Sequence, residues 1–379
     1  MQEGNSSLRI AVDRRSIRWR EGTGVARYRD TLSVALARLG AAVSPVRDGG
    51  EVAAMPAWRD LPRTISRRVH AEPLGDGWQV ADLYRLAQRH FSLTGSLLDV
   101  IVADPPALMH WSHPLPIRLV GATNLYTVHD LIPLETPELS GVSANRYARL
   151  LGRIVAAAAH IVTVSETVRA AVIERCRIDE DQVTCCYQAV EPGPPGPLPA
   201  GLRHGGYFLV LGRVESRKNI ERLILAHRIA ATDASLVIAG PDGHWSSAAE
   251  RRRVQALLEQ PQIIRLAWQS PQDVAALVVG ARALLMPSLS EGFGLPAIEA
   301  MRARVPAMVS AVGAAAEIAG DGALTVDPHD VEAIAVGITR LNRDEVLRDG
   351  LIARGAERAA AFDIESFAAR LSRLYERFG

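Results

Sequence analysis

The sequence predicts an α/β protein built from two doubly wound domains that face each other across a cleft. Short runs of β-branched residues alternate with longer amphipathic segments along the chain, a pattern typical of parallel sheets covered by helices on both faces. The alternation stops at a segment rich in proline and glycine, residues 189–201, and restarts after it. A chain of 379 residues is also too long for one ordinary core and fits two domains of comparable size.

The first half opens with a strand-like run, LRIAV (8–12), which a helix-like segment (25–40) follows. Further strands are expected at 125–130 and 160–165, and the second of these leads into a helix that begins near Glu166. Ligands of doubly wound sheets bind at the carboxyl ends of the strands. The polar residues that follow these strands are therefore candidates for a site.

The segment AVEPGPPGPLPAG (189–201) can hold neither a helix nor a central strand, because proline lacks the backbone N–H and glycine is conformationally permissive. It is predicted to be a linker. The expected division is an N-terminal domain over 1–192, the linker over 193–204, a second domain over 205–362 and a final helix over 363–379.

The second half repeats the alternation of strands and helices. Strands are expected at 207–212, 235–240, 262–267, 282–288 and 307–310. Helices are expected at 219–230, 297–304 and 364–379. This regular order predicts a second parallel sheet.

Composition excludes several classes of protein. The formal net charge is +1, so no global field attracts nucleic acid. The three cysteines, Cys176, Cys185 and Cys186, have the spacing of neither a disulfide framework nor a zinc site. The N-terminus lacks an apolar signal core, and no apolar run is long enough to span a bilayer, so a cytoplasmic protein is expected.

The first ninety or so residues are locally basic. A solvated face in an arginine-biased sequence is one interpretation of this charge. Docking onto an anionic membrane surface or onto a phosphate-bearing acceptor is the other. Peripheral association with the cytoplasmic membrane therefore stays open.

The stretch LGRVESRKNIERL (211–223) contains Lys218, the only lysine of the chain. Arg213 directly follows the strand 207–212, and Lys218 stands where the next helix begins. Helix N-termini favour anions through their free N–H groups and dipole. A guanidinium and an ammonium added at this edge make a candidate pocket for a diphosphate.

The second constellation is SLSEGFGLPAIEAM (288–301). Glu291 lies in a glycine-rich loop after a strand, and Glu299 falls about one turn into the following helix. Gly292 and Gly294 allow a close approach of the backbone to a ligand. A carboxylate accepts hydrogen bonds from two hydroxyl groups, so sugar rings are natural partners.

With these two motifs the chain resembles the donor half of the retaining glycosyltransferases of family 4, which have the GT-B architecture, and most closely their mannosyltransferase-like branch. The segment VPAMVSAVGAAAEIAGDGALTVDP (305–328) continues the resemblance. It implies that Glu291 contacts the transferred sugar, that Glu299 binds the ribose hydroxyls and that Arg213 and Lys218 clamp the diphosphate. The backbone of Phe293, Gly294 and Leu295 is expected to assist.

The first half carries the same resemblance. REGTGVARYRDTL (20–32) resembles the glycine loop of the family, which places Gly22 and Gly24 near the phosphates or the acceptor. YTVHDLIPLETPEL (126–139) resembles its His-Asp loop, in which His129 faces the transferred sugar. The expected acceptor-side residues are Asp130, Ser165 and His113.

The resemblance also implies roles for whole domains. The first domain is expected to bind the acceptor, the second to bind the nucleotide sugar, and the final helix to pack back on the first domain. Three positions depart from the usual pattern of the family, namely Ala26, Arg304 and Ala314. They stand beside the motifs and affect the placement of acceptor or base more than the diphosphate clamp.

The function implied is transfer of a hexose, with retention at the anomeric carbon, onto a hydroxyl of a lipid-linked or growing oligosaccharide in bacterial surface polysaccharide synthesis. GDP-mannose is the favoured donor, and a UDP-sugar is the alternative. No Asp-x-Asp pair stands where a manganese-dependent transferase needs one, so neither a metal nor another cofactor is expected.

Three rival functions fit the sequence less well. A nicotinamide dehydrogenase would want G-x-G-x-x-G after its first strand, but EGTGVARY contains only the first G-x-G. A sugar phosphorylase would need a lysine for its pyridoxal cofactor, and the single lysine is already assigned to the clamp. A non-catalytic carbohydrate-binding relative is the third, and the presence of Arg213, Lys218, Glu291 and Glu299 argues against it.

Overall fold

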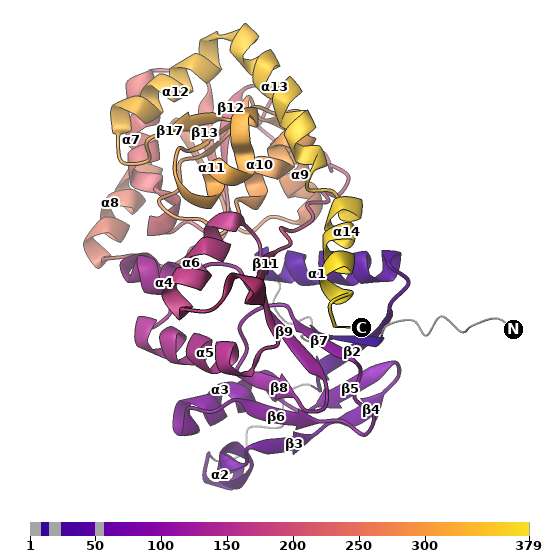
Figure 1. Cartoon of the computed structure of the whole chain (residues 1–379). Helices are drawn as coiled ribbons and strands as arrows, with labels where there is room; N and C mark the ends of the chain where they lie inside the picture. Colours follow the sequence, from indigo (N-terminus) through magenta and orange to yellow (C-terminus); the bar gives the residue numbers. More distant parts are fainter. Residues whose placement is uncertain (1–8, 15–23, 50–56, 379) are drawn as a thin grey trace, which may run out of the picture.

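The computed structural model describes residues 9–14, 24–49 and 57–378. Two α/β domains are stacked along the long axis of the molecule, and the chain passes from the lower to the upper domain near residue 190 (Figure 1). The predicted fold class, two doubly wound domains facing across a cleft, is confirmed.

The described part of the first domain contains an eight-stranded sheet. In spatial order its strands are β11 (Val183–Cys185), β10 (His160–Thr163), β9 (Thr123–Val128), β7 (Leu108–Trp111), β1 (Arg9–Arg14), β2 (Ala42–Asp48), β5 (Gly77–Val80) and β4 (Glu72–Leu74). All neighbours pair in parallel except β4 and β5, which form an antiparallel edge. The alternating pattern anticipated the parallel core of this sheet but not its β5–β4 edge.

The described residues of this domain also form a small parallel sheet and six helices. The sheet has the order β3 (Arg68–His70), β6 (Leu98–Ile101) and β8 (Ile117–Leu119). The helices are α1 (Gly24–Arg38), α2 (Ala57–Ile65), α3 (Leu83–Thr94), α4 (Ile132–Glu135), α5 (Ala144–Ala157) and α6 (Glu166–Cys176), with short 3-10 turns η1 (Pro137–Leu139) and η2 (Glu180–Gln182). Ser165 ends the preceding loop and caps α6 by accepting a hydrogen bond from Val168 N–H.

The second domain contains a six-stranded parallel sheet. Its spatial order is β14 (Ile263–Leu266), β13 (Ser235–Ala239), β12 (Tyr207–Leu211), β15 (Ala283–Met286), β16 (Ala307–Ser310) and β17 (Leu324–Val326). Counted along the domain this is the doubly wound order 3-2-1-4-5-6, whose direction reverses between β12 and β15. The loops after β12 and β15 therefore border a ligand crevice.

Helices cover both faces of this sheet (Figure 1). They are α7 (Ile220–Ala230), α8 (Ala248–Leu258), α9 (Pro271–Gly280), α10 (Leu295–Arg302), α11 (Gly313–Ala319), α12 (Val331–Arg343) and α13 (Glu345–Ala360), with 3-10 turns η3 (Ser216–Lys218) and η4 (Gly320–Gly322). Several of these helices follow a serine or aspartate whose side chain accepts hydrogen bonds from the first backbone N–H groups. For α9, Ser270 and Asp273 form a complete capping box around Pro271 in the first turn.

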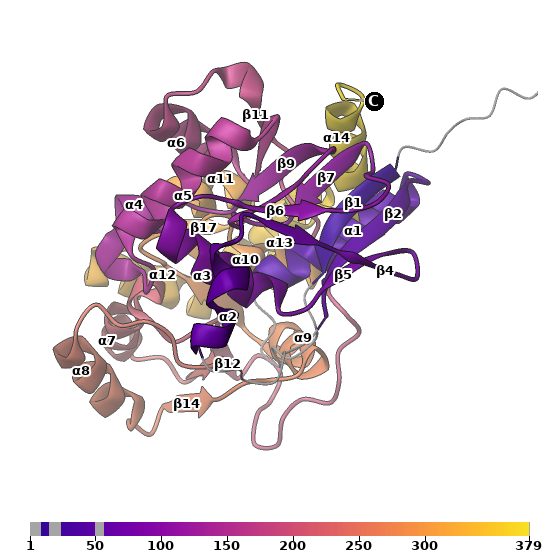
Figure 2. The same ribbon diagram turned by 90° about the horizontal axis from the view of Figure 1, so that it is seen from below.

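The last helix, α14 (Ile364–Tyr375), leaves the second domain and lies against α1 of the first (Figure 1; Figure 2 shows the same pair from below). Tyr375 contributes its hydroxyl to a 2.5 Å hydrogen bond with Nδ1 of His110. The ring of Phe367 lies 5.8 Å from the ring of Tyr28 on α1. Residues 186–206, all of which are described, form neither helix nor strand.

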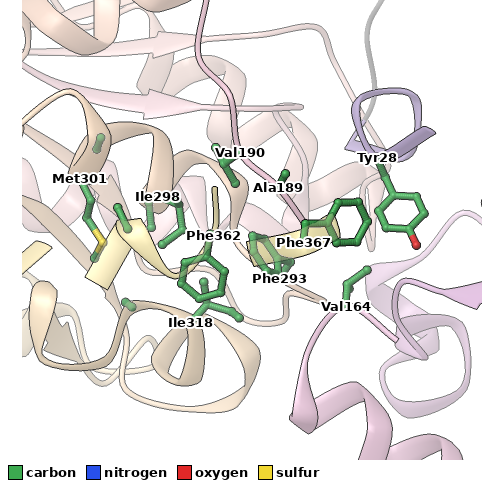
Figure 3. Close-up of a cluster of buried hydrophobic side chains, with 14 of the residues drawn as sticks. Tyr28, Val164, Ala189, Val190, Phe293, Ile298, Met301, Ile318, Phe362 and Phe367 are labelled. Atoms are coloured by element: carbon green, nitrogen blue, oxygen red, sulfur yellow. The ribbon is translucent and has the colours of Figure 1, made fainter. Parts of the chain in front are cut away.

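One hydrophobic cluster spans the boundary between the domains (Figure 3). Phe293, from the loop after β15, lies between Phe362 and Phe367 in this view, and Tyr28 continues the row. The rings of Phe293 and Phe362 meet edge to face with centroids 5.5 Å apart. Along the described part of the chain, no helix combines the length and the apolar character needed to cross a bilayer.

Candidate active site

A cavity of about 690 Å³ opens between the two domains, at the carboxyl ends of both sheets. From the first domain it is lined by the loop after β9, which carries His129 and Asp130, and by the start of α1. From the second it is lined by the loops after β12 and β15, which carry Lys218 and Glu291. The two motifs singled out in the sequence thus meet in one space.

Lys218 ends the 3-10 turn η3 and is only 6% exposed. Its Nζ lies 2.6 Å from Oε1 of Glu291. The stem passes the end of β12, where a Cβ added to Gly212 would lie 3.1 Å from Cε of the lysine. Burial lowers the pKa of Lys218, and the neighbouring carboxylate of Glu291 opposes this shift. A side chain with a thin stem and a compact charge fits this passage.

Glu291 is held from two sides. Arg217 donates to its Oε2 at 2.6 Å while Lys218 bonds its other oxygen. Burial alone would raise the pKa of the Glu291 carboxyl, but the two cations outweigh burial and lower it to about 2. Glu291 is therefore ionised at any physiological pH.

Sequence reasoning missed Arg217. Besides Glu291, its guanidinium bonds Ser290 O at 3.0 Å and Glu215 Oε1 at 2.8 Å, and the pKa of Arg217 is raised because the attraction of Glu291 and Glu215 exceeds the effect of burial. Its adjacency to the lone lysine was the available signal. Arg213, which is expected to clamp the diphosphate together with Lys218, lies at the exposed rim of the cavity, where its guanidinium bonds Asp242 O at 2.9 Å.

Glu299 is buried in α10, one turn from the start of the helix, and lines the cavity. Its carboxylate is ion-paired with Arg27, which comes from α1 of the opposite domain. This contact between residues 272 positions apart was not anticipated from the sequence. It gives the first domain a cation that reaches a carboxylate of the second.

The glycine-rich loop 291–295 packs against the first domain. A Cβ added to Gly292 would lie 1.9 Å from the carbonyl oxygen of His129, so only glycine permits this approach. Gly294 has φ +104 and precedes Leu295, the first residue of α10, without a side-chain cap on that helix. Gly24 faces Leu295, whose Cδ1 would lie 3.3 Å from an added Cβ.

His129 directly follows β9 and lies at the wall of the cavity. Its Nε2 donates to Ser112 O at 2.8 Å, which leaves Nδ1 as the acceptor of a neutral ring. Burial lowers the pKa of His129 to about 4. Burial also raises the pKa of Asp130, whose Oδ1 accepts a hydrogen bond from Ile132 N.

Two of the expected acceptor-side residues do not line the described cavity. Ser165 stands at the domain boundary, where its hydroxyl donates to Gly292 O at 2.9 Å. His113 is 3.1 Å from the hydroxyl of Ser112, which in turn donates to the buried Asp13. Gly22, expected near the phosphates or the acceptor, lies outside the described residues.

The loop after β14 and the start of α9 also line the cavity, with Trp268, Gln269 and Pro271 in its wall. The ends of β12 and β13 lie close together, since a Cβ on Gly240 would lie 2.1 Å from Gly212 O. Among the described residues there is no group of three or more His, Cys, Asp or Glu side chains placed to hold a metal ion.

Comparison with known proteins agrees with this architecture. A family model described as glycosyl transferases group 1 matches residues 204–358, and one described as glycosyltransferase family 4 matches residues 22–194. O-antigen chain mannosyltransferase B of Escherichia coli is 31% identical over 66% of this chain and 69% of its own. O-antigen chain mannosyltransferase RfbU of Salmonella typhimurium is 28% identical over 54% of this chain and 56% of its own.

Among solved structures, the sucrose-phosphate synthase from Thermosynechococcus elongatus has a TM-score of 0.70 at 20% identity, with 98% of each chain covered. The fold and the matches define a glycosyltransferase of GT-B architecture. The chain belongs to glycosyltransferase family 4 and is similar to mannosyltransferases of O-antigen synthesis.

Proposed function

We propose that the protein transfers a hexose from a nucleoside diphosphate sugar to an acceptor hydroxyl, with retention at the anomeric carbon and without a metal ion. The observation that carries this proposal is the position of Lys218 and Glu291, which lie 2.6 Å apart in the wall of the interdomain cavity. A cation for the leaving diphosphate and a carboxylate for the sugar are then adjacent.

The chemical problem in such a transfer is separation of charge. The leaving diphosphate gains negative charge while the sugar ring becomes cationic. Lys218, Arg213 at the rim and the uncapped start of α10 are preorganised to stabilise the leaving group. The leaving phosphate itself would take the proton of the acceptor hydroxyl on the same face of the ring.

The sugar would lie between Glu291 and the loop of His129. Because the pKa of Glu291 is about 2, its carboxylate is available to stabilise the positive charge that develops on the ring. His129 is neutral, since its pKa is about 4, and is suited to accept a hydroxyl hydrogen bond at Nδ1. Glu299 would bind the ribose hydroxyls, and Asp130 would face the acceptor side.

For the donor we propose GDP-mannose, with a UDP-sugar as the alternative. Similarity to two O-antigen mannosyltransferases supports mannose. In the cavity wall, Trp268 and Pro271 offer aromatic and apolar surface for a nucleobase, and Gln269 beside them offers polar groups. The acceptor would be a lipid-linked or growing oligosaccharide, met in the cytoplasm or at the inner face of the membrane.

The test is a screen of the purified protein against GDP- and UDP-sugars with EDTA present. Thermal stabilisation, release of nucleoside diphosphate and the anomeric configuration of the product are measured. Lys218→Met removes the ammonium while keeping an unbranched side chain, and Arg253→Met, in an exposed ion pair with Glu221, serves as the control.

Release of GDP from GDP-mannose, lost in Lys218→Met and kept in Arg253→Met, is the expected result. Turnover of a UDP-sugar alone would keep the mechanism and replace the donor. Inactivity in EDTA that Mn²⁺ or Mg²⁺ restores would refute metal independence. A product with inverted configuration at the anomeric carbon would refute retention. If no nucleotide sugar stabilised the protein or released a nucleoside diphosphate, a non-catalytic binding protein would be favoured.

A further inference from the structure

We propose that Glu317 is a positioning residue, which locks the second domain onto the first and thereby keeps the loop of Glu291 in register with the loop of His129. Its effect on the reaction rests on the proposed function, whereas the contact itself does not. Glu317 belongs to none of the motifs assigned a chemical role.

Glu317 lies on α11 of the second domain, and its side chain reaches the N-terminus of α6 in the first. Its Oε1 accepts a hydrogen bond from Glu166 N at 2.8 Å. Its Oε2 accepts from Thr167 N at 2.7 Å and from the Thr167 hydroxyl at 2.6 Å. The two helices lie side by side across the domain boundary (Figure 1 and Figure 2).

These bonds complete the cap of α6 from another domain. The first N–H groups of a helix have no partner within it, and they carry a positive partial charge that favours a carboxylate. Ser165 satisfies only the third of these groups, that of Val168. The first two, on Glu166 and Thr167, are therefore satisfied by Glu317.

The backbone that carries Glu317 is itself held in place. Arg358, on α13, donates to Glu317 O at 2.7 Å and to Ile318 O at 2.9 Å, at the carboxyl end of α11. A guanidinium at that end also suits the helix dipole. The Arg358 guanidinium lies over the ring of Phe362, 5.2 Å from its centroid. The side chain that holds α11 is therefore itself packed against the interdomain cluster.

The Glu317 contacts adjoin the loops of the candidate active site. Next to the two capped residues, Ser165 donates its hydroxyl to Gly292 O at 2.9 Å. Gly292 adjoins Glu291 and packs on the carbonyl of His129. A movement of the domains that broke the Glu317 contacts would also strain these two loops, because Ser165, which bonds Gly292, directly precedes the residues that Glu317 caps.

The proposal predicts that loss of Glu317 lowers turnover more than it weakens nucleotide binding. Lys218 and Glu299 belong to the second domain, and Arg27, which reaches Glu299 from α1, takes no part in the Glu317 contacts, so binding of a nucleoside diphosphate depends little on the lock. The transferred sugar would contact both domains, and small misplacements of reacting groups cost up to about a hundredfold in rate. Loss of Glu317 should therefore lower kcat about ten- to hundredfold and change the Kd of GDP or UDP by less than about threefold.

The first experiment compares Glu317→Ala and Glu317→Gln with the control Glu332→Ala. Glu332 is an exposed glutamate in the first turn of α12 of the same domain. The Gln variant keeps an oxygen that accepts a hydrogen bond but loses the charge, so it should recover part of kcat. A wild-type kcat in Glu317→Ala, or an equal loss in Glu332→Ala, would overturn the proposal.

A second measurement needs no turnover. Amide hydrogen exchange of the wild-type protein should show protection at Glu166 and Thr167, because both N–H groups are bonded to Glu317. That protection should disappear in Glu317→Ala and persist in Glu332→Ala. Fast exchange of these amides in the wild-type protein would overturn the lock even if the Ala variant failed to fold. If no nucleotide sugar were turned over, the exchange data would still decide whether the lock exists, and only the proposed function would fail.

Discussion

Nζ of Lys218 lies 2.6 Å from Oε1 of Glu291, so the only lysine of the chain is ion-paired with the carboxylate that faces the same cavity. Arg217 binds the other oxygen of that carboxylate. Glu291 thus supplies the countercharge for both cations.

Replacement of Lys218 by methionine should weaken binding of GDP or UDP at least tenfold, because the compact charge beside the leaving group is lost. The protein without ligand should lose roughly 1.5–3 kcal/mol of unfolding free energy, the usual range for a hydrogen bond to a charged group, since Arg217 still pairs with Glu291. Nucleotide titration and urea unfolding measure the two effects. Unchanged nucleotide affinity would remove Lys218 from the clamp.

Glu291→Gln should separate binding from turnover. The substitution removes the negative charge that competes for Lys218 and Arg217, so a nucleoside diphosphate should bind as tightly as to the wild type or more tightly. Turnover should fall by about two orders of magnitude, in line with loss of one preorganised charge stabiliser. Calorimetric titration with GDP beside an assay of kcat distinguishes the two. Weaker binding together with normal turnover would contradict the role proposed for Glu291.

Arg27→Met should raise the KM for the donor more than it lowers kcat. Arg27 orients the carboxylate of Glu299, which is proposed to hold the ribose, and it does so from the other domain. A rise of about threefold to tenfold is expected, in the range of one charge-assisted hydrogen bond partly exposed to solvent. Arg29→Met is the matched control, because Arg29 stands on the same helix and pairs with its neighbour Asp30. Equal effects in both variants would speak for a general change in α1.

Phe362→Ala should destabilise the protein by about 3–5 kcal/mol, the usual cost of removing a buried phenylalanine. Its ring is 1% exposed and contacts the rings of Phe293 and Tyr187. Chemical unfolding measures the loss, and Val346→Ala, at a side chain that is 84% exposed, should change the stability little. A loss below about 1 kcal/mol would show that the interdomain cluster contributes little to folding.

Stability should decline as the pH falls below about 6.5. Burial lowers the pKa of His110 to about 3 and that of His160 to about 4, whereas both titrate near 6.5 in the unfolded chain. Between those values the unfolded state binds more protons, so each histidine removes about 1.4 kcal/mol of unfolding free energy per pH unit, and none of this loss occurs at higher pH. Urea unfolding at pH 7, 6 and 5 measures the slope. His160→Asn should reduce it, and an unchanged slope would assign the acid effect elsewhere.

Much of the candidate site could be predicted because its residues are local in the sequence. Lys218 follows a buried strand by seven residues, and Glu291 and Glu299 flank one glycine-rich turn, so parallel topology alone brings both motifs to one edge of the sheet. Gly294 has φ +104, a backbone conformation that glycine adopts readily and other residues rarely do. Arg304 has φ +56, so the chain adopts a left-handed conformation there without glycine, the residue that favours it.

The sequence by itself determined two parallel sheets, the linker between them and the motifs at their strand ends, because hydrophobic period and turn residues act over a few positions. The tertiary structure alone decided which charges meet. Arg27 pairs with Glu299 and Glu317 caps α6 across more than 140 residues of chain, and Arg217, beside the lone lysine, reaches Glu291. Such partners depend on how two domains dock, and no local pattern encodes that geometry.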